Sequence, residues 1–472
     1  MHPDYYSVSD VLAVARLHPF YSSTTYPPTR EELPHILAKS KGLATDLELA
    51  SFPLTWKSEL YKQITRLTVD LDPRNGYRRS TYISTTGGGS GRGPPMIFAT
   101  DSVENHQQRV VLGSMLKICG ILEPGDWVLT MHNAGHLYRA LDLMTEVFES
   151  AGAAVLCAGP DMDHKDVIDT IAEYQVNVIS GDAGQLVQLA KSIATLPDEQ
   201  RMSLRVNKLL YTSEAITPAQ RSFLASVFGP IALSSVIGSA EAGPWGVSSA
   251  EMTVGAADRN YTDFIFDQRL IHLEVFPLSI EELNEGERNQ HGHNIEPLSE
   301  GEKGLLIQTS LQRLRNPLVR YVCGDVASLH PLPETVQRKL PQETSHHYKV
   351  VRIYGRDRRI SFDWYGEYFE FQVVQALMRT ESWGVLQYQI ILRNKEEDVS
   401  GVATVLEVRI LRGTGNGQIS EPELTREIRN FFMVFDFNEE LFQLTFLSNY
   451  SGFVRSTTGR KVINFVNWTG KN

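Results

Sequence analysis

Short apolar runs and amphipathic stretches alternate along the first half of the chain. Each apolar run has the length of a strand buried on both faces, and each stretch between them carries apolar positions at helical spacing. The expected strands are 96–101, 125–131, 153–158 and 176–180, and the expected helices are 105–119, 137–150, 164–174 and 183–195. Such an alternation predicts βαβ crossovers, and therefore an α/β fold with mostly parallel sheets flanked by helices.

The alternation continues into two strands that end in candidate binding turns. Residues 209–214 form one expected strand, with Ser213 and Glu214 at its end. A second strand at 231–237 runs into the glycine-rich turn 238–246. Ligands of open α/β sheets bind outside the carboxyl ends of the strands, so we expect the functional site at these turns.

The pattern changes near residue 355, where the regular alternation stops. Two helical patterns and two strand-like runs follow, and they predict a small α+β unit: helices at 368–378 and 421–433, and strands at 386–392 and 402–411. We therefore expect two domains, 1–354 and 355–472.

Composition limits the classes of protein that fit. The 472 residues are 42% hydrophobic and 21% charged, as in an ordinary globular protein of two or more domains. The formal net charge of −11 argues against a nucleic-acid or anionic-membrane surface. Its 3 cysteines are far apart, which favours neither a disulfide framework nor a cysteine zinc site and fits a cytoplasmic protein. No apolar run approaches the length of a membrane span.

The stretch 84–95 has the strongest chemical signal in the chain, because glycines let a backbone approach a ligand closely and turn its N–H groups inward. Thr86 and Ser90 add hydroxyl donors, and Arg92 adds a forked cation suited to phosphate. A phosphate-binding loop is one interpretation and a flexible surface turn is the other, since the spacing fits neither common nucleotide-loop pattern. Its glycines are Gly87, Gly88, Gly89, Gly91 and Gly93.

Two further positions suggest ligands. Glu241 lies in the turn after a buried strand, where a carboxylate can hold a metal ion against a phosphate, although an exposed turn glutamate is the alternative. His132 and His136 are spaced to share one face of a helix. No third ligand is evident for them, so we expect structural or pocket-lining roles.

Several motifs, taken in order, resemble the adenylate-forming ligase superfamily, most closely its phenylacetate–coenzyme A ligase branch, over nearly the whole chain. The most specific match is the block from Gly301 to Asp325, which resembles "G-E-x-G-x-L-x-x-T … P-x-x-R-Y-x-x-x-D". The other matching segments are 54–60 ahead of the glycine loop, the loop at 86–94, the turn at 238–241, the hinge at 353–360 and the tail loop at 454–461.

The resemblance implies a role for each matched residue. Glu241 would hold Mg²⁺, Asp325 would accept hydrogen bonds from the ribose of ATP, and Arg356 would lie on the ribose side. The remaining ATP-binding residues would be Thr86, Gly87, Gly88, Gly89, Ser90, Gly91, Arg92, Ser213, Glu214, Gly238 and Ser239. By analogy, the acid pocket would include His132, His136, Tyr138, Asp182, Ala242, Gly243 and Trp245.

The sequence also departs from the family pattern. Gly89 and Ala240 stand where hydroxyl residues are usual, and Arg358 and Arg359 replace two hinge acids. In the tail loop Arg460 occupies the place of the family's catalytic lysine, and Lys461 follows one position later. Either Lys461 acts through a local backbone shift or Arg460 is the working cation.

The implied activity is attack of a carboxylate on the α-phosphate of ATP, which gives an acyl-adenylate and pyrophosphate, followed by transfer to coenzyme A. An amine acceptor, giving an amide, and a non-catalytic acyl- or nucleotide-binding homologue are the alternatives. Tyr138 and Trp245 would suit an aryl or aryl-acetic acid. We expect a large adenylation domain with a small mobile C-terminal lid, a monomer or homodimer, and neither nucleic acid nor membrane as a partner.

Overall fold

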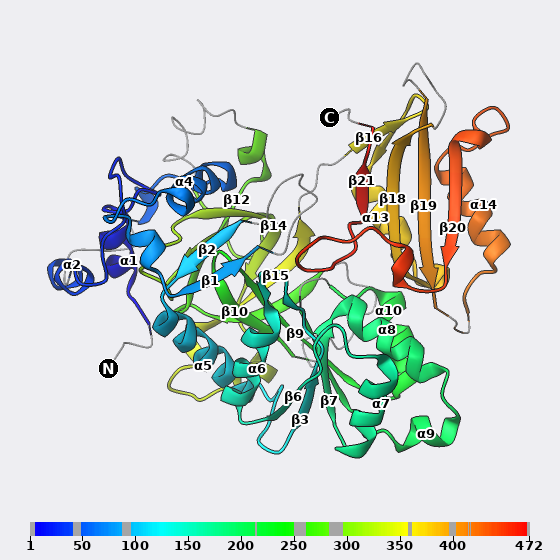
Figure 1. Cartoon of the computed structure of the whole chain (residues 1–472), viewed down its shortest axis with the longest axis horizontal. Helices are drawn as coiled ribbons and strands as arrows, with labels where there is room; N and C mark the ends of the chain where they lie inside the picture. The colour runs from blue at the N-terminus through cyan, green and yellow to red at the C-terminus, as the bar shows by residue number, and fades with distance from the viewer. Residues whose placement is uncertain are drawn as a thin grey trace.

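The computed structural model describes residues 5–40, 49–86, 96–212, 215–249, 261–282, 296–356, 361–395, 403–413, 415 and 417–469. A large sheet and its helices occupy residues 5–356, which we call the body, and a separate smaller sheet lies in residues 361–469, which we call the lid. Figure 1 shows the lid beside the body, with its red loop near residue 460 extending back towards the body.

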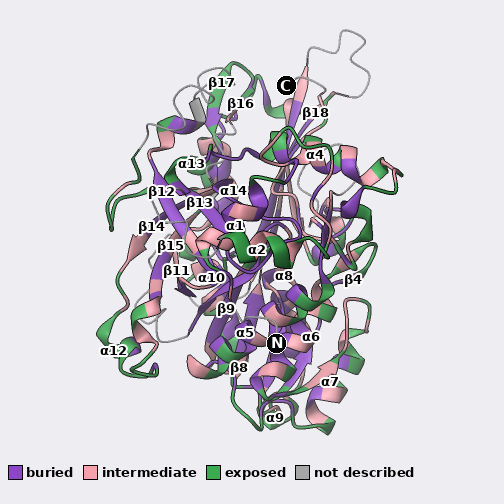
Figure 2. Cartoon of the chain, turned by 90° about the vertical axis from the view of Figure 1, so that its left-hand side faces the viewer, coloured by how far each residue is buried: buried purple, intermediate pink, exposed green. Residues whose placement is uncertain are grey.

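Eleven strands of the described residues form the central sheet of the body. Their spatial order is β12 (Ile271–Phe276), β13 (Gly304–Ser310), β14 (Tyr321–His330), β15 (Tyr348–Arg356), β11 (Thr262–Asp267), β10 (Gly243–Ser248), β9 (Ala232–Ser239), β8 (Lys208–Thr212), β7 (Val178–Asp182), β3 (Trp127–Thr130) and β6 (Ala154–Cys157). In Figure 2 the buried positions follow these strands.

The sheet is mixed, although the α/β class predicted from the alternation is correct. Strands β6, β3, β7, β8 and β9 are parallel, whereas the pairs from β9 to β12 are antiparallel. The difference follows from the connections. Helices join the parallel strands, while the short turn 240–242 joins the antiparallel neighbours β9 and β10.

Helices cover the body sheet. They are α1 (Val8–Ala15), α2 (Leu33–Ser40), α4 (Lys57–Val69), α5 (Ser102–Ile118), α6 (Ala140–Ala151), α7 (His164–Glu173), α8 (Ala183–Ala194), α9 (Asp198–Ser203), α10 (Pro218–Phe228) and α12 (Glu334–Gln337). Helix α8 begins directly after β7 because Asp182 caps it, accepting from Gln185 N at 2.8 Å. Within the described ranges, no helix combines the length and apolar character that a membrane crossing requires.

Two expected helices begin later than the sequence pattern predicts. His136 and Leu137 have φ angles of 47° and 67°, so they turn a hairpin between β4 (Ala134–Gly135) and β5 (Tyr138–Arg139) before α6 begins. In the lid, the first residues of the expected helix 368–378 belong instead to β17 (Glu367–Glu370). There the Phe369 ring stacks on Phe362 of β16 at 5.4 Å, an aromatic pairing that favours the strand.

The lid is an α+β unit around a four-stranded sheet. Its strands lie in the order β20 (Phe442–Leu447), β19 (Thr404–Arg412), β18 (Val385–Asn394) and β21 (Phe465–Asn467). The hairpin of β16 (Ser361–Trp364) with β17, and the helices α13 (Phe371–Met378) and α14 (Glu421–Phe431), complete it. This arrangement fits the small C-terminal domain expected from the sequence.

An apolar core is continuous between lid and body. Five buried lid residues, namely Leu386, Leu411, Tyr450, Phe453 and Val462, belong to the same hydrophobic cluster as the residues of α8 and α10 in the body. Polar contacts border this core: Gln220 Nε2 donates to Leu386 O at 2.6 Å, and Ser222 Oγ donates to Glu381 Oε1. Burial of this apolar surface stabilises one orientation of the lid on the body.

Candidate active site

The end of β9 turns sharply and places Glu241 at the tip of the β9–β10 hairpin. Gly238 pairs with Pro244 across this hairpin, and a Cβ on Gly238 would lie 2.7 Å from Pro244 Cα. Glycine is therefore required for the close approach of the two strands. Ser239 Oγ accepts from Ala242 N at 3.0 Å and closes the turn.

Glu241 is held by groups that are distant in sequence. Its Oε1 accepts hydrogen bonds from Tyr61 Oη at 3.0 Å and from Tyr321 Oη at 3.3 Å. Arg313 Nη1 donates to the backbone carbonyls of Ala240 and Glu241 at 2.8 Å each. Burial and the Glu241 charge raise the pKa of Tyr321, so this hydroxyl stays protonated as a donor.

The chemistry of this carboxylate fits one mode of metal binding. Among the described residues, Glu241 Oε2 has no hydrogen-bond partner, and no group of three His, Cys, Asp or Glu could hold a metal ion. Mg²⁺ in nucleotide enzymes is commonly bound by one or two carboxylates together with substrate phosphates and water. One oriented carboxylate therefore fits Mg²⁺ that arrives with a nucleotide.

The glycine loop connects the two strands of a hairpin. Gly87, Gly88, Gly89, Ser90, Gly91 and Arg92 lie outside the described residues, as do Ser213 and Glu214. The strands on either side of the loop, β1 (Tyr82–Thr85) and β2 (Ile97–Thr100), are described and pair antiparallel. Thr86 N donates to Met96 O at 3.0 Å, and Met96 N donates to Thr86 Oγ1 at 3.2 Å. These bonds fix both ends of the loop.

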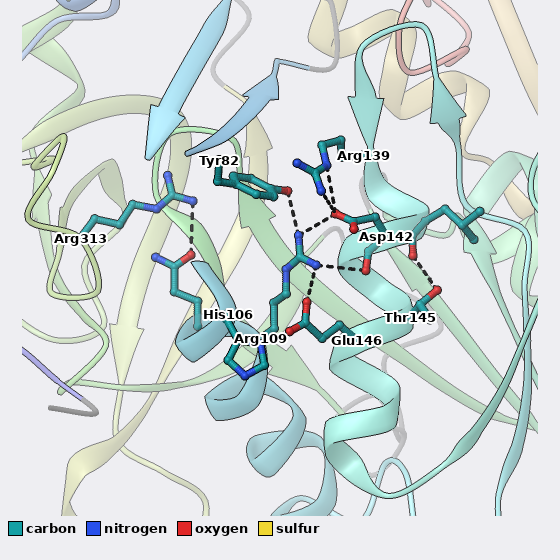
Figure 3. A network of polar contacts seen from close by, with 10 residues as sticks. Tyr82, His106, Arg109, Arg139, Asp142, Thr145, Glu146 and Arg313 are labelled. Atoms are coloured by element: carbon teal, nitrogen blue, oxygen red, sulfur yellow. Dashed lines mark hydrogen bonds and ion pairs between the residues drawn. The ribbon is translucent and has the colours of Figure 1, made fainter. Parts of the chain in front are cut away.

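A buried arginine anchors this hairpin to two helices (Figure 3). Arg109 of α5 donates to Tyr82 Oη at 2.9 Å and pairs with Asp142 and Glu146 of α6. The guanidinium of Arg139, in β5, lies 4.2 Å from the centroid of the Tyr82 ring. Because Tyr82 begins β1, this network holds the strand that leads into the glycine loop.

The two expected ribose residues are neighbours in the sheet. Asp325 in β14 is paired in register with Arg356, the last residue of β15. Three other predicted positions lie further along the same sheet: Ser239 at the end of β9, Glu241 in the following turn and Asp182 at the end of β7. Their predicted roles in nucleotide binding stay predictions.

The lid loop 455–462 reaches the body at the strand ends. An isolated β-bridge pairs Arg455 with Val462, and Ser456 N donates to Lys461 O at 2.8 Å. From the body, Asn133 Nδ2 donates to Gly459 O at 2.7 Å, and Thr458 Oγ1 donates to Thr86 O at 3.3 Å. The loop thus contacts both β3's carboxyl end and the first residue of the glycine loop.

The neighbours Arg460 and Lys461 have different surroundings. Arg460 has a φ of 51°, and its guanidinium pairs with the exposed carboxylate of Asp161 and donates to His136 Nε2 at 3.3 Å. Lys461 interacts electrostatically with His132 and with Asp182. Among the described residues the Lys461 ammonium has no hydrogen-bond or ion-pair partner. Both residues line the same cavity, and the choice between them as the working cation stays a prediction.

His132 is a buried neutral imidazole. Ser180 Oγ donates to Leu210 O at 3.0 Å, so it accepts from His132 Nε2 at 3.1 Å. Burial and the Lys461 charge lower the pKa of His132 to about 3. His132 and His136 share no helix face, because the hairpin of β4 and β5 begins between them.

A cavity of about 110 Å³ opens between the strand ends and the lid loop. Of the predicted pocket residues, Asp182 lines it, whereas His136 and Tyr138 lie on the hairpin of β4 and β5 nearby. Ala242 and Trp245 are instead packed in a hydrophobic core, with the Trp245 ring edge-on to Phe266. The cavity lining is Met131, Asn133, Gly159, Pro160, Met162, His164, Asp182, Ala183, Gly184, Gln185, Gln188, Gln387, Tyr450, Arg455, Arg460, Lys461 and Val462.

Sequence reasoning missed several residues that hold these groups in place. Tyr61, Tyr321 and Arg313 surround Glu241, and Asn133 binds the lid loop. Tyr321 lies inside the Gly301–Asp325 block, so its place in that motif could have indicated it as a site residue. Nothing local marks the others, because each acts on a partner far along the chain.

No protein-family model matches the sequence, and a comparison with curated proteins also finds no match. Among solved structures the chain is similar to the amide bond synthetase McbA from Marinactinospora thermotolerans, with 11% identity, 84% of this chain and 71% of that chain covered, and a TM-score of 0.47.

The chain is also similar to 2-hydroxyisobutyryl-CoA ligase. The postadenylation state of that ligase, in complex with R3-HIB-AMP, has 14% identity and a TM-score of 0.62, with 97% of this chain and 87% of that chain covered. Its thioesterification state, in complex with 2-HIB-AMP and CoA, has 14% identity and a TM-score of 0.53, with 97% and 88% covered. The chain therefore has the fold of adenylate-forming acyl-CoA ligases.

Proposed function

We propose that this protein is an ATP-dependent ligase that converts a carboxylic acid into an acyl-adenylate, releases pyrophosphate and transfers the acyl group to coenzyme A. The observation that carries the proposal is the position of Lys461. An ammonium without a described partner lies at the strand ends, on a loop that also contacts the first residue of the glycine loop. Such a cation suits charge that develops at an α-phosphate.

Adenylation needs no general base, because a carboxylic acid is already ionised near pH 7. A carboxylate oxygen forms a bond to the α-phosphorus while the bond from that phosphorus to the bridging oxygen breaks, and pyrophosphate leaves with the electron pair. Lys461 balances charge at the reacting phosphate, the loop after Thr86 binds the remaining phosphates, and Asp325 orients the ribose. Glu241 Oε2 would hold Mg²⁺, which when bound neutralises phosphate charge.

The orientation of the lid supports adenylation as the step represented here. The TM-score is 0.62 with the postadenylation state of the hydroxyisobutyryl-CoA ligase and 0.53 with its thioesterification state. We assign the body to the adenylation domain predicted at 1–354 and the lid to the small domain predicted at 355–472, with β15 extending the body to Arg356. In the second step the sulfur of coenzyme A would attack the acyl carbonyl carbon and release AMP.

One observation favours a second acceptor. The apolar core shared by lid and body, which includes Leu386 and Phe453, opposes a large rotation of the lid. An amine that attacks the adenylate without lid rotation would give an amide and AMP. Supplying a preformed acyl-adenylate with coenzyme A or with a primary amine separates the two acceptors by the product formed.

The adenylation itself is tested by acid-dependent exchange of labelled pyrophosphate into ATP. A panel should include phenylacetate, because the resemblance predicts an aryl or aryl-acetic acid. Tyr138 and Trp245, which suggested that class, are absent from the lining of the described cavity. Exchange with at least one acid supports the proposal, and a protein that binds ATP yet exchanges with no acid contradicts it.

A further inference from the structure

The cavity between lid and body contains more cationic groups than adenylation requires. Lys461, Arg455 and Arg460 all line it. Arg460 is paired with Asp161, but Arg455 and Lys461 have no ion pair with a described residue. Adenylation accounts for Lys461 and leaves Arg455 without a role.

Arg455 is positioned by the lid loop and partly desolvated. Its backbone bridges to Val462, and its guanidinium lies 5.8 Å from the centroid of the Tyr450 ring. Burial lowers the pKa of Arg455, while the charge of Asp182 acts in the opposite direction. A guanidinium carries five N–H donors in a planar fork, and carboxylate or other oxygen acceptors satisfy it best.

Asp182 does not supply that acceptor by direct contact. Its Oδ1 accepts from Gln185 N as the cap of α8, and no ion pair joins it to Arg455 among the described residues. Burial raises the pKa of Asp182, and adenylation already assigns Lys461 to the reacting phosphate, so neither group satisfies the Arg455 guanidinium. Its fork has no hydrogen-bond acceptor or ion-pair partner among the described residues and is available to an oxygen of the substrate.

The cavity is also small and mostly polar. Its volume is about 110 Å³, where about 10 to 15 Å³ is enough to hold one water molecule. Pockets that enclose drug-sized ligands are typically about 300 Å³ or larger. Asn133 and Gln188 are among the polar lining residues, so the walls favour a short, oxygenated ligand.

We infer that the acid activated by this protein is a short carboxylic acid with a second oxygen acceptor, either a hydroxyl, a keto group or a second carboxylate, which binds to Arg455. The inference rests on the proposed function and names the substrate class of that site. Lys461 would face the reacting phosphate, where the substrate carboxylate attacks, and Arg455 would face the second oxygen. An acid without that oxygen would leave the half-buried guanidinium without a hydrogen-bond acceptor. The unpaired group would cost binding free energy, so such an acid should bind more weakly.

The test compares acids of similar length in pyrophosphate–ATP exchange: propionate, lactate, malonate and, as an aryl acid, phenylacetate. We expect kcat/KM for lactate or malonate to exceed that for propionate by roughly 10- to 100-fold, the effect of one charge-assisted hydrogen bond. Arg455→Leu should reduce this ratio to about one, and Arg455→Lys should retain part of it. Arg426→Gln, on the exposed face of α14, is the control and should keep the wild-type ratio.

A second readout separates this inference from the proposed function. Binding of each acid is measured by the shift in Tm of wild type and Arg455→Leu. Selective binding of oxygenated acids that depends on Arg455, without exchange, upholds the inference and contradicts the proposed function. Exchange with propionate or phenylacetate at rates equal to the oxygenated acids, or a ratio that Arg455→Leu leaves unchanged, overturns the inference while adenylation stands. Equal shifts for all acids, or none, also overturn it.

Discussion

Arg460 and Lys461 are adjacent in the chain, yet they act on different groups. Arg460 binds the exposed carboxylate of Asp161, whereas Lys461 interacts electrostatically with the buried His132 and with Asp182, which lines the cavity. The backbone at Arg460 has a φ of 51°, at the point where the two neighbouring side chains diverge to these different partners. A non-glycine residue in the left-handed region is uncommon and costs free energy, so the lid loop must stabilise it through contacts such as Asn133 to Gly459.

Glu241→Gln should raise the Mg²⁺ concentration needed for adenylation by roughly 10-fold or more, because the carboxylate charge is lost. Tyr321→Phe should have a smaller effect, because it removes one of the two hydrogen bonds that orient Oε1. Exchange rates measured against Mg²⁺ concentration check both, with Glu334→Gln on α12 as an exposed control. An unchanged Mg²⁺ dependence in Glu241→Gln, with normal Tm, would refute the metal assignment.

Asp325→Ala should weaken ATP binding by about one to two orders of magnitude, since a charge-assisted hydrogen bond contributes about 1.5 to 3 kcal/mol. The substrate offers its own control. Calorimetric titration of the wild type with 2′-deoxy-ATP should show weaker binding than with ATP. Equal affinities for the two nucleotides would mean that Asp325 does not recognise the ribose.

Glu104, in α5, makes stability depend on pH. Burial raises its pKa to about 7, above the ordinary 4.5, with Asp101 adding and Arg313 opposing. Its stabilising contribution is therefore complete below pH 4.5 and is lost as pH rises through 7. Glu104→Gln should remove this dependence. The variant should therefore be more stable than the wild type at pH 8, by a larger margin than at pH 5. Urea unfolding at both pH values measures it, and parallel losses in wild type and variant would contradict the assignment.

Phe453→Ala should loosen the lid, because removal of a buried aromatic ring from a core costs about 3 to 5 kcal/mol. The readouts are a larger radius of gyration in X-ray scattering and faster proteolytic separation of the lid from the body. Phe437→Ala removes a ring that is 69% exposed and should leave the lid in place. If Phe453→Ala scatters like the wild type, the apolar core does not fix the lid.

The sequence predicts best those strands and helices that the local pattern of apolar residues determines. Parallel strands such as β7 and β8 are buried on both faces and read as apolar runs, so their alternation with helices was visible. The groups around Glu241 could not be predicted from the sequence, because Tyr61 and Tyr321 lie 180 and 80 residues away from it. The choice between Arg460 and Lys461 also stayed open, since it depends on a backbone angle that residue types alone do not determine.

The most direct test of the account is single-turnover adenylation by Lys461→Ala and Arg460→Ala, with an acid that supports exchange in the wild type. Both residues line the cavity, but Arg460 is paired with Asp161 and the Lys461 ammonium has no described partner. Lys461→Ala should therefore reduce the rate by roughly 100-fold or more, and Arg460→Ala by roughly 10-fold or less. Comparable Tm values for both variants serve as the control for folding. A dead Arg460→Ala beside an active Lys461→Ala would contradict the account and would make the guanidinium the working cation.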